Sequence, residues 1–290
     1  MLRRKGGIYM GQTCDLHIHS TFSDGTYTPE QLLQAAEACG LSAVALCDHN
    51  TVAGLPDFLA AGEKSRVEAV AGTEFSTDYN GVELHILGLF IRPEHFDTVT
   101  ALLEDFRERK DKSNRDLVEA LSAAGYIMDY DAIRNATPNG QVNRAHIAAA
   151  LFEHGYTESV KDGFKRLLAP KHGFYKPPAR LDAFDCIRFI KSLGCVAVWA
   201  HPFLSLDGEE EVREFLKQAV PCGLDGMETV YSTYDEEQSR IAAALAEEFG
   251  LKQSGGSDFH GANKPDISLG TGRGNLRIPI ALLEDLKKAL

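Results

Sequence analysis

The sequence predicts an α/β barrel that is interrupted by a helical insert. Seven short apolar segments with the pattern of β-strands recur along the chain, and most are separated by segments with helical periodicity. This alternation is typical of parallel βα units, which close into a barrel or form an incomplete one. Between the fourth and fifth strands the chain shows helical patterns alone, which predicts an insert at that point.

The first strand is expected around residues 15–20, where apolar and polar residues alternate. A helix then begins at Pro29, a residue type favoured at the first helical position. Thr28 is its predicted N-cap, and Gln31 completes a capping box three residues later. Gly40 is expected to end this helix, because glycine adopts the left-handed conformation common after a helix.

The other six strands are predicted from short apolar segments, at residues 43–47, 69–75, 82–90, 195–200, 226–230 and 251–254. Asn80-Gly81 predicts a hairpin turn between the third and fourth strands. Further helices are predicted up to about residue 65 and at residues 96–124, 130–135, 143–154, 158–168, 182–193, 209–220 and 235–249. We therefore expect a barrel domain over residues 12–100 and 181–290, and a helical insert that caps the substrate over residues 101–180.

The composition is that of a globular protein. The chain has 290 residues, of which 44% are hydrophobic, enough for one large α/β domain or a domain with an insert. No run reaches the roughly 18 apolar residues of a membrane span, and the basic N-terminus lacks the apolar stretch of a secretory signal. We therefore expect a cytoplasmic protein with no membrane partner. The six cysteines show no CxxC spacing and are interpreted as reduced packing residues.

The charge of the chain is negative but unevenly placed. A formal charge of −12 argues against unspecific attraction to nucleic acid, so no stable duplex partner is expected. Residues 104–180 nevertheless hold 13 Lys and Arg against 11 Asp and Glu. The insert is therefore the electropositive part, where a polyanionic substrate would be held. The sequence gives no sign of an obligate protein partner.

Candidate metal ligands lie at or near the ends of the predicted strands. His17 and His19 share one side of the first strand, although a lone His-x-His is weak evidence for a metal site. The full set, which includes one carboxylate in the loop after that strand, is His17, His19, Asp24, His49, Glu74, His85, His201, Asp258 and His260. Six of the ten histidines and three carboxylates in such positions predict a metal centre where the strand ends meet. This set contains more ligands than one or two metal ions require, and its size fits three metal ions.

The ligand types narrow the choice of metal. Imidazoles and carboxylates without cysteine suit Mn²⁺, Fe²⁺ and Zn²⁺ alike.

Asp15 has the same strand parity as His17 and His19 and should lie one layer deeper. It either orients an imidazole as a hydrogen-bond acceptor or is a buried carboxylate with another partner, and both interpretations stay open at this point.

The chain resembles the polymerase and histidinol phosphatase (PHP) family of metal-dependent phosphoesterases in six segments, DLHIHSTFSDGTYTPE, CDHNT, AGTEFS, ELHILG, AHP and GSDFHG. The resemblance implies a distorted (β/α)₇ barrel with a trinuclear metal centre. It further implies that Glu74 bridges two of the ions. The implied ligands are His17, His19, Glu74 and Asp258 for one metal, Glu74, His85 and His201 for a second, and Asp24, His49 and His260 for a third.

The insert is similar to that of stand-alone family members that act on nucleoside 3′,5′-bisphosphates and on short RNA 5′ ends. The similar segments are residues 142–148 and 164–170. This resemblance implies that Arg144 binds the second phosphate of the substrate. Lys171 and His172 stand where another basic residue is expected, and which of the two binds is left open.

The resemblance therefore implies a metal-dependent phosphoric monoester hydrolase. The expected substrate is a nucleoside 3′,5′-bisphosphate, which would lose its 3′-phosphate, or a short oligoribonucleotide. A hydroxide that bridges two metals is expected to attack the phosphorus atom. The alternatives are a histidinol-phosphate phosphatase with the same chemistry, an amidohydrolase-type metal-dependent hydrolase and a non-catalytic metal-binding module. An amidohydrolase would place a bridging lysine where Glu74 stands, which argues against that class.

Overall fold

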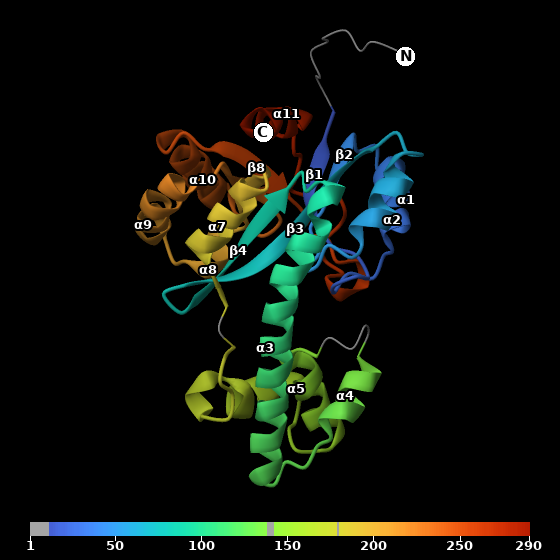
Figure 1. The fold of residues 1–290 in the computed structure, drawn as a ribbon, viewed down its shortest axis with the longest axis vertical. Coiled ribbons are helices and arrows are strands. Elements are labelled where there is room, and N and C mark those ends of the chain that lie inside the picture. Colours follow the sequence, from blue (N-terminus) through green and yellow to red (C-terminus); the bar gives the residue numbers. More distant parts are fainter. Residues whose placement is uncertain (1–11, 138–141, 179) are drawn as a thin grey trace. The chain divides into compact units, whose positions relative to one another are not determined.

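The computed structural model describes residues 12–137, 142–178 and 180–290. The chain forms two compact units, one that runs up to Thr100 and resumes at Leu181, and one that comprises Ala101–Arg180. Each unit has its own secondary structure and its own hydrophobic core (Figure 1).

The first unit is built around a barrel-shaped sheet with the strand order β1-β2-β3-β4-β6-β7-β8. These strands are β1 (Cys14–Ile18), β2 (Ala43–Leu46), β3 (Glu68–Tyr79), β4 (Val82–Leu89), β6 (Val196–Trp199), β7 (Gly226–Tyr231) and β8 (Lys252–Gly256). The two-residue strand β5 (Leu181–Asp182) pairs with the end of β3. The sheet nearly closes, because the N–H of Asp258, just beyond β8, donates to the carbonyl of His17 in β1. The predicted seven-stranded barrel is confirmed.

The sheet is mixed and not wholly parallel. It differs in this respect from the parallel barrel that the alternation of strands and helices predicts. Strand β4 runs antiparallel to both β3 and β6. The cause is the predicted hairpin: Asn80 and Gly81 have φ values of 53° and 84°, as a tight turn between neighbouring strands requires. Strands joined by such a turn cannot be parallel. His85 therefore reaches the site from the first half of β4 and not from its C-terminal end.

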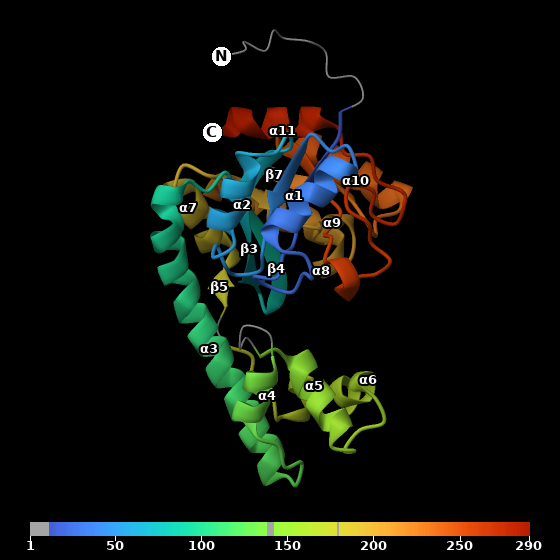
Figure 2. The same ribbon diagram turned by 90° about the vertical axis from the view of Figure 1, so that its right-hand side faces the viewer.

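Helices cover the outside of the barrel (Figures 1 and 2). They are α1 (Pro29–Ala38), α2 (Leu55–Gly62), α7 (Ala183–Ser192), α8 (Pro202–Ser205), α9 (Glu209–Ala219), α10 (Glu236–Glu248) and α11 (Ile280–Leu286), with 3₁₀ turns at Pro93–His95, Val220–Cys222, Gly261–Asn263 and Lys287–Ala289. The capping box of α1 is confirmed, because the Thr28 hydroxyl accepts from the N–H of Gln31 and the Gln31 side chain accepts from the N–H of Thr28. Among the described helices, none is both long and apolar enough to cross a bilayer.

The core of the barrel consists mainly of small and branched apolar side chains. Alternate residues of the strands, such as Leu87 and Val198, pack with one another and with Leu283 of α11. All six cysteines are free thiols. Their interpretation as packing residues fits the four that are buried, Cys14, Cys47, Cys186 and Cys195, whereas Cys39 is exposed and Cys222 is partly exposed.

The described residues of the second unit form helices joined by turns and contain no strand. Its elements are α3 (Phe96–Ala123), which begins in the first unit, α4 (Tyr130–Ala136), α5 (Arg144–Glu153), α6 (Val160–Gly163), a π-helical turn at Phe164–Leu168 and a 3₁₀ turn at Pro170–His172. Leu117 and Leu121 of α3 lie in one hydrophobic core with Ile147 and Leu151 of α5. This core lets the unit hold its own helices together.

Candidate metal centre

Glu74 lies at the centre of the cluster that the strands form at one end of the barrel. It is fully buried in β3, and each of its carboxylate oxygens faces different imidazoles. Oε1 lies 2.8 Å from Nδ1 of His85 and 3.0 Å from Nε2 of His201. Oε2 lies 2.9, 3.3 and 3.4 Å from ring nitrogens of His49, His17 and His19. One carboxylate is thus shared by imidazoles from several strands of the barrel.

Two further carboxylates complete the cluster. Asp258 follows β8 directly and places Oδ1 3.1 Å from Nε2 of His19. Asp24 lies in the loop after β1 and is half-exposed, and its carboxylate lies 3.1 Å from Nε2 of His260 and 3.8 Å from Nε2 of His49. The structure therefore brings together all of the residues that the sequence singles out as candidate ligands.

The cluster divides into overlapping groups whose ligand atoms lie within 4.8 Å of one another: His19, Asp24, His49 and His260; His17, His19 and Glu74; and His49, Glu74 and His85. This grouping differs from the one that the family resemblance implies. His19 also faces the group around Asp24, and His49 also faces Glu74. His201 contacts Glu74 but belongs to none of these groups.

The donor set fits divalent metal ions. Several buried polar atoms of the cluster have no hydrogen-bond partner. They are ring nitrogens of His17, His19, His201 and His260, and one carboxylate oxygen each of Glu74 and Asp258. Unpartnered buried polar atoms are rare in folded proteins, and several that converge are expected where an ion binds. The chemistry of these atoms, imidazole nitrogen and carboxylate oxygen, suits Mn²⁺, Fe²⁺ or Zn²⁺.

The protonation states of His19 and Glu74 suit metal binding, whereas three other rings must lose a proton when an ion binds. The Glu74 carboxylate outweighs burial and raises the pKa of these rings, which belong to His17, His49 and His85. Burial and the neighbouring imidazoles of His49 and His260 lower the pKa of His19 to about 3, so its ring is neutral and has a lone pair to offer. Burial raises the pKa of Glu74, but the adjacent imidazoles, His49 foremost, outweigh burial and hold that pKa well below its usual range. A neutral ring and an ionised carboxylate are the forms that coordinate metals.

Backbone features aim the side chains at the centre. A Cβ at Gly256 would lie 2.2 Å from Cβ of His17, so only glycine lets β8 pass this close to β1. His201 and Asp258 have φ values of 31° and 58°, which turn their side chains away from the strand direction. Such non-glycine residues carry about 1–3 kcal/mol of strain each, and they cluster at functional sites.

Glu228 is a residue of the centre that the sequence analysis missed. It is buried in β7, its Oε1 lies 3.1 Å from Nδ1 of His17, and its Oε2 accepts from the N–H of His201. It therefore holds the His17 ring with Nε2 toward Glu74, as carboxylates often do for metal-binding histidines. A charged residue within an otherwise mostly apolar strand was the signal that could have revealed it.

Asp15 has partners other than an imidazole, so the second of its two open interpretations is correct. It accepts hydrogen bonds from the N–H and the hydroxyl of Ser257 and from the N–H of Gly270. It thereby ties the segment beyond β8 to β1 and helps to close the barrel. Glu228 takes the role of orienting an imidazole instead.

Asp48 holds the loop that carries Asp24. Its carboxylate accepts from the N–H and hydroxyl of Ser20 and from the hydroxyl of Ser23, at 2.6–2.7 Å. The carbonyl of Asp24 in turn accepts from the side-chain amide of Asn263. The half-exposed carboxylate of Asp24 is therefore fixed from both sides of its loop.

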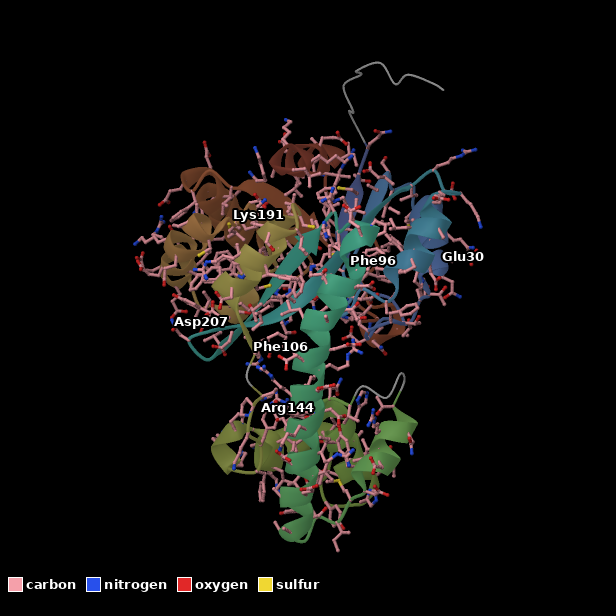
Figure 3. All side chains as sticks on the ribbon, viewed as in Figure 1. Glu30, Phe96, Phe106, Arg144, Lys191 and Asp207 are labelled. Atoms are coloured by element: carbon pink, nitrogen blue, oxygen red, sulfur yellow. The ribbon has the colours of Figure 1, made fainter. Side chains whose placement is uncertain are left out.

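The three substrate-binding candidates lie in the second unit. Arg144 begins α5, and its guanidinium lies 4.5 Å from the centre of the Tyr175 ring (Figure 3). Lys171 is exposed. Within the described part of the chain, no carboxylate forms an ion pair with either cation. Nε2 of His172 donates to the carbonyl of Lys165 at 2.7 Å.

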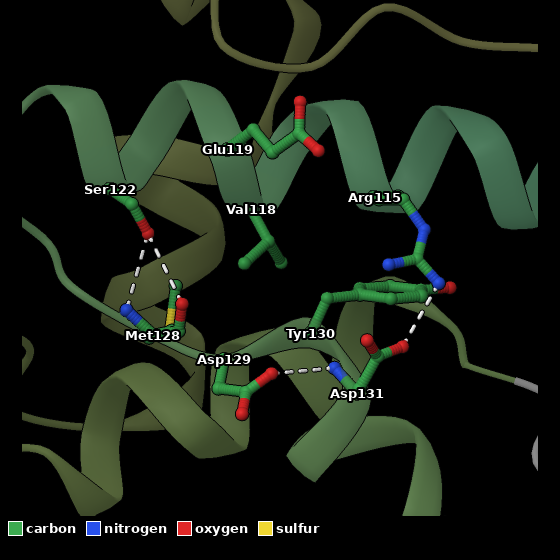
Figure 4. Close-up of a pocket in the computed structure, with 8 residues that line it drawn as sticks. All are labelled: Arg115, Val118, Glu119, Ser122, Met128, Asp129, Tyr130 and Asp131. Carbon is green, nitrogen blue, oxygen red and sulfur yellow. Dashed lines mark hydrogen bonds and ion pairs between the residues drawn. The ribbon is translucent and has the colours of Figure 1, made fainter.

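A separate hollow lies between α3 and α4 (Figure 4). It is lined by Arg115, Val118, Glu119, Ser122, Met128, Asp129, Tyr130 and Asp131. The Arg115 guanidinium is paired with Asp131 at 3.0 Å. Three carboxylates around one paired guanidinium disfavour a phosphate. The barrel end remains the site at which phosphate chemistry fits.

The chain is similar in sequence to a known domain family and to several characterised proteins. The model of the PHP domain family matches residues 15–175. The chain is 34% identical to a 5′-3′ exoribonuclease of Haemophilus influenzae, over 87% of this chain and 91% of the relative. It is 33% identical to a phosphoribosyl 1,2-cyclic phosphate 1,2-diphosphodiesterase of Eggerthella lenta, over 85% of this chain and 94% of the relative.

A further relative is a 3′,5′-nucleoside bisphosphate phosphatase of Chromobacterium violaceum, which is 29% identical over 85% of this chain and 86% of its own length. A solved structure from Bifidobacterium adolescentis, assigned as a metal-dependent phosphoesterase, matches with a TM-score of 0.78 and 28% identity and covers 96% of both chains. The family match spans more than half of the chain and includes most of the clustered ligand candidates. The chain therefore belongs to the PHP domain family and is a metal-dependent phosphoesterase.

Proposed function

We propose that this phosphoesterase removes the 3′-phosphate from nucleoside 3′,5′-bisphosphates and also acts on the ends of short oligoribonucleotides. The observation that carries the proposal is the guanidinium of Arg144, which stacks on Tyr175 and lies in a different unit from the candidate metal ligands. We infer from the resemblance of the insert that this cation binds a part of the substrate other than the phosphate held by metals. Relatives named as a bisphosphate phosphatase and as an exoribonuclease support a nucleotide substrate.

The clustered residues at the barrel end are proposed to hold about three divalent ions, Mn²⁺, Zn²⁺ or Fe²⁺. Bound ions polarise phosphoryl oxygens and lower the pKa of water, which is the chemistry a phosphoesterase needs. Glu74 is suited to serve two ions, because imidazoles face each of its oxygens. The proposed ligands are His17, His19, Asp24, His49, Glu74, His85, His201, Asp258 and His260.

The chain's own residues prepare this centre before an ion arrives. Glu228 fixes the ring of His17, and Asp48 fixes the loop of Asp24. Ligands that are already in place need little reorganisation when they bind, and they hold a reacting phosphate in one orientation. Even with Glu228 counted, four carboxylates balance only part of the charge of three dications, so the loaded pocket is electropositive and suits a phosphate.

Arg144 is proposed to bind the second phosphate through charge-assisted hydrogen bonds. Tyr175 and Phe164 lie 4.5 and 5.9 Å from its guanidinium, and stacking on a ring leaves the N–H groups at the guanidinium edge free to donate. Of the two other basic candidates, Lys171 is better supported. Nε2 of His172 is already engaged with the carbonyl of Lys165.

A hydrolysis assay that measures free phosphate and also separates the nucleotide and sugar products tests this proposal, since cleavage of a phosphodiester releases no free phosphate. Chelator-treated protein is supplied with Mn²⁺ and given adenosine 3′,5′-bisphosphate, a short 5′-phosphorylated RNA, histidinol phosphate or an aryl phosphate. We expect the highest kcat/KM for the two nucleotide substrates. A preference for histidinol phosphate would overturn the proposed substrate and leave the phosphoesterase assignment intact.

A cyclic phosphodiester of a sugar phosphate is the second candidate substrate. The similarity to the diphosphodiesterase of Eggerthella lenta, over nearly the whole of that relative, favours it. Arg144 would then bind the distal phosphate of the sugar. Adding phosphoribosyl 1,2-cyclic phosphate to the same assay separates the two candidates, because only the second predicts it to be the preferred substrate.

A further inference from the structure

Asp258 is held by the protein on one carboxylate oxygen and left open on the other. Oδ2 accepts hydrogen bonds from the hydroxyl of Tyr231 at 2.5 Å and from Nζ of Lys264 at 2.6 Å. Oδ1 is buried without a hydrogen-bond partner and lies 3.1 Å from Nε2 of His19. One oxygen therefore faces the other candidate ligands, and the second is already occupied.

The two donors on Oδ2 differ in kind. Tyr231 is buried in β7, so its neutral hydroxyl positions the carboxylate without adding charge. Lys264 follows the turn Gly261–Asn263, has a side chain that is 38% exposed, and brings a full positive charge. The backbone of Asp258 is held independently, since its N–H donates to the carbonyl of His17. Loss of the lysine side chain should therefore leave Asp258 in place.

We propose that Lys264 is a positioning residue that restricts Asp258 to binding a metal ion through Oδ1 alone. This inference rests on the metal centre of the proposed function. A carboxylate with two free oxygens is able to bind one ion through both and so takes a second coordination position. With Oδ2 held by an ammonium group, that position stays open for substrate or water.

The charge of Lys264 has a further effect on the centre. A cation beside a carboxylate reduces the attraction of that carboxylate for a second cation, so Lys264 should weaken metal binding while it keeps the position open. A residue that merely supports a ligand behaves in the opposite way, because its removal typically weakens metal binding about tenfold to hundredfold. The direction of the change in affinity therefore separates the two roles.

The experiment measures the Zn²⁺ affinity of chelator-treated protein by competition with a chromophoric chelator, and kcat in Mn²⁺ with adenosine 3′,5′-bisphosphate. Lys264→Met removes the charge and the donor, Lys264→Gln keeps a donor without charge, and Lys264→Arg keeps both. We expect the Met variant to bind Zn²⁺ about threefold to tenfold more tightly and to lose about tenfold in kcat. The Gln variant should also bind more tightly, and Lys264→Arg should restore wild-type values.

Lys288→Met is the matched control. Lys288 also pairs with an aspartate, Asp285, but it is an exposed residue of the 3₁₀ turn that follows α11 and contacts none of the clustered ligands. We expect its Zn²⁺ affinity and kcat to equal those of the wild type. Glu74→Ala tests the centre itself, because wild-type Zn²⁺ binding in that variant would refute the proposed metal site and with it the role of Lys264. Weakened Zn²⁺ binding in Glu74→Ala, together with no effect of Lys264→Met, would refute the role of Lys264 alone.

Thermal unfolding identifies the variants that fold normally. Weaker or unchanged Zn²⁺ binding in folded Lys264→Met and Lys264→Gln would overturn the proposal, as would an unchanged kcat in both. If the Met variant does not fold, the Gln variant alone gives the direction of the change. Tighter binding with lower kcat, reversed by Lys264→Arg, is the result that supports it.

Discussion

Nδ1 of His17 lies 3.1 Å from Oε1 of Glu228, and both side chains are fully buried. The other carboxylate oxygen of Glu228 accepts from the backbone N–H of His201. One side chain thus fixes the ring of a candidate ligand and the backbone of another. The contact joins residues 211 positions apart in the sequence.

We expect Glu228→Gln to lower metal affinity about tenfold. A glutamine offers one acceptor and one donor group, so it cannot accept from the His17 ring and from the His201 N–H together. One of the two contacts is lost whichever way the amide is turned. Zn²⁺ competition with a chromophoric chelator measures the change, with Glu247→Gln on the exposed face of α10 as the control. Equal affinities in the two variants would contradict the role given to Glu228.

Glu74→Ala should remove more than one metal ion per chain, because imidazoles face each oxygen of this carboxylate. Metal analysis of protein purified without chelators measures the content directly. Glu68→Ala is the control, since Glu68 is the first residue of β3 and pairs with Lys287 at the surface. A Glu74 variant with undiminished metal content would rule out the bridging role.

Arg144→Ala should lose about 2 to 4 kcal/mol of transition-state stabilisation with adenosine 3′,5′-bisphosphate, as expected for a severed charge-assisted contact. The loss should be much smaller with a small aryl phosphate, which has no second phosphate to bind. The values of kcat/KM for both substrates in Mn²⁺ give this difference. Equal losses on the two substrates would place Arg144 at the reacting phosphate or in the fold.

Arg115→Ala provides a matched comparison for Arg144. Arg115 lies in the same unit and also stacks 4.5 Å from an aromatic ring, that of Tyr130, but its charge is paired with Asp131. We expect its removal to leave the ratio of kcat/KM for the two substrates unchanged. A change as large as that of the Arg144 variant would show that stacking arginines of this unit act through the fold.

Gly256→Ala should lower the free energy of unfolding by about 3 kcal/mol, because the new Cβ would meet Cβ of His17 at 2.2 Å. Neither atom is able to move without the backbone that carries it. Urea unfolding measures the loss. Gly163→Ala is the control, since its Cβ would make an ordinary contact at 3.5 Å in the helical unit. Equal stability of the two variants would mean that β8 has more freedom beside β1 than described.

Local sequence signals predicted much of the architecture. The Thr28 capping box and the Asn80-Gly81 turn depend on residues a few positions apart, and both form as expected. The clustering of most candidate ligands followed from their places at or near strand ends, because a barrel brings those ends together. Glu74 and His85 lie instead within the hairpin strands β3 and β4. The capping box, the turn and most of the clustering were predictable because they depend either on residues close together in the sequence or on the way a barrel places its strand ends.

Other features depend on contacts that no local pattern encodes. Glu228 and His17 meet only because β7 and β1 come together in the closed sheet, and strand parity alone could not distinguish Glu228 from Asp15 as the partner of an imidazole. The Asn80-Gly81 turn implied that β4 runs antiparallel to β3. The alternation of strands and helices in the rest of the barrel nevertheless favoured a fully parallel sheet. The positive φ of His201 was not predictable from the sequence, because most histidines, like most other non-glycine residues, have negative φ values.

The products formed from adenosine 3′,5′-bisphosphate test the central claim most directly. Chelator-treated protein is incubated with this substrate, with and without added Mn²⁺, and the nucleotide product and free phosphate are separated and identified. The account predicts that adenosine 5′-monophosphate and phosphate form in equal amounts, and only when Mn²⁺ is present. Formation of adenosine 3′-monophosphate, equal turnover without metal, or no turnover with Mn²⁺ would contradict it.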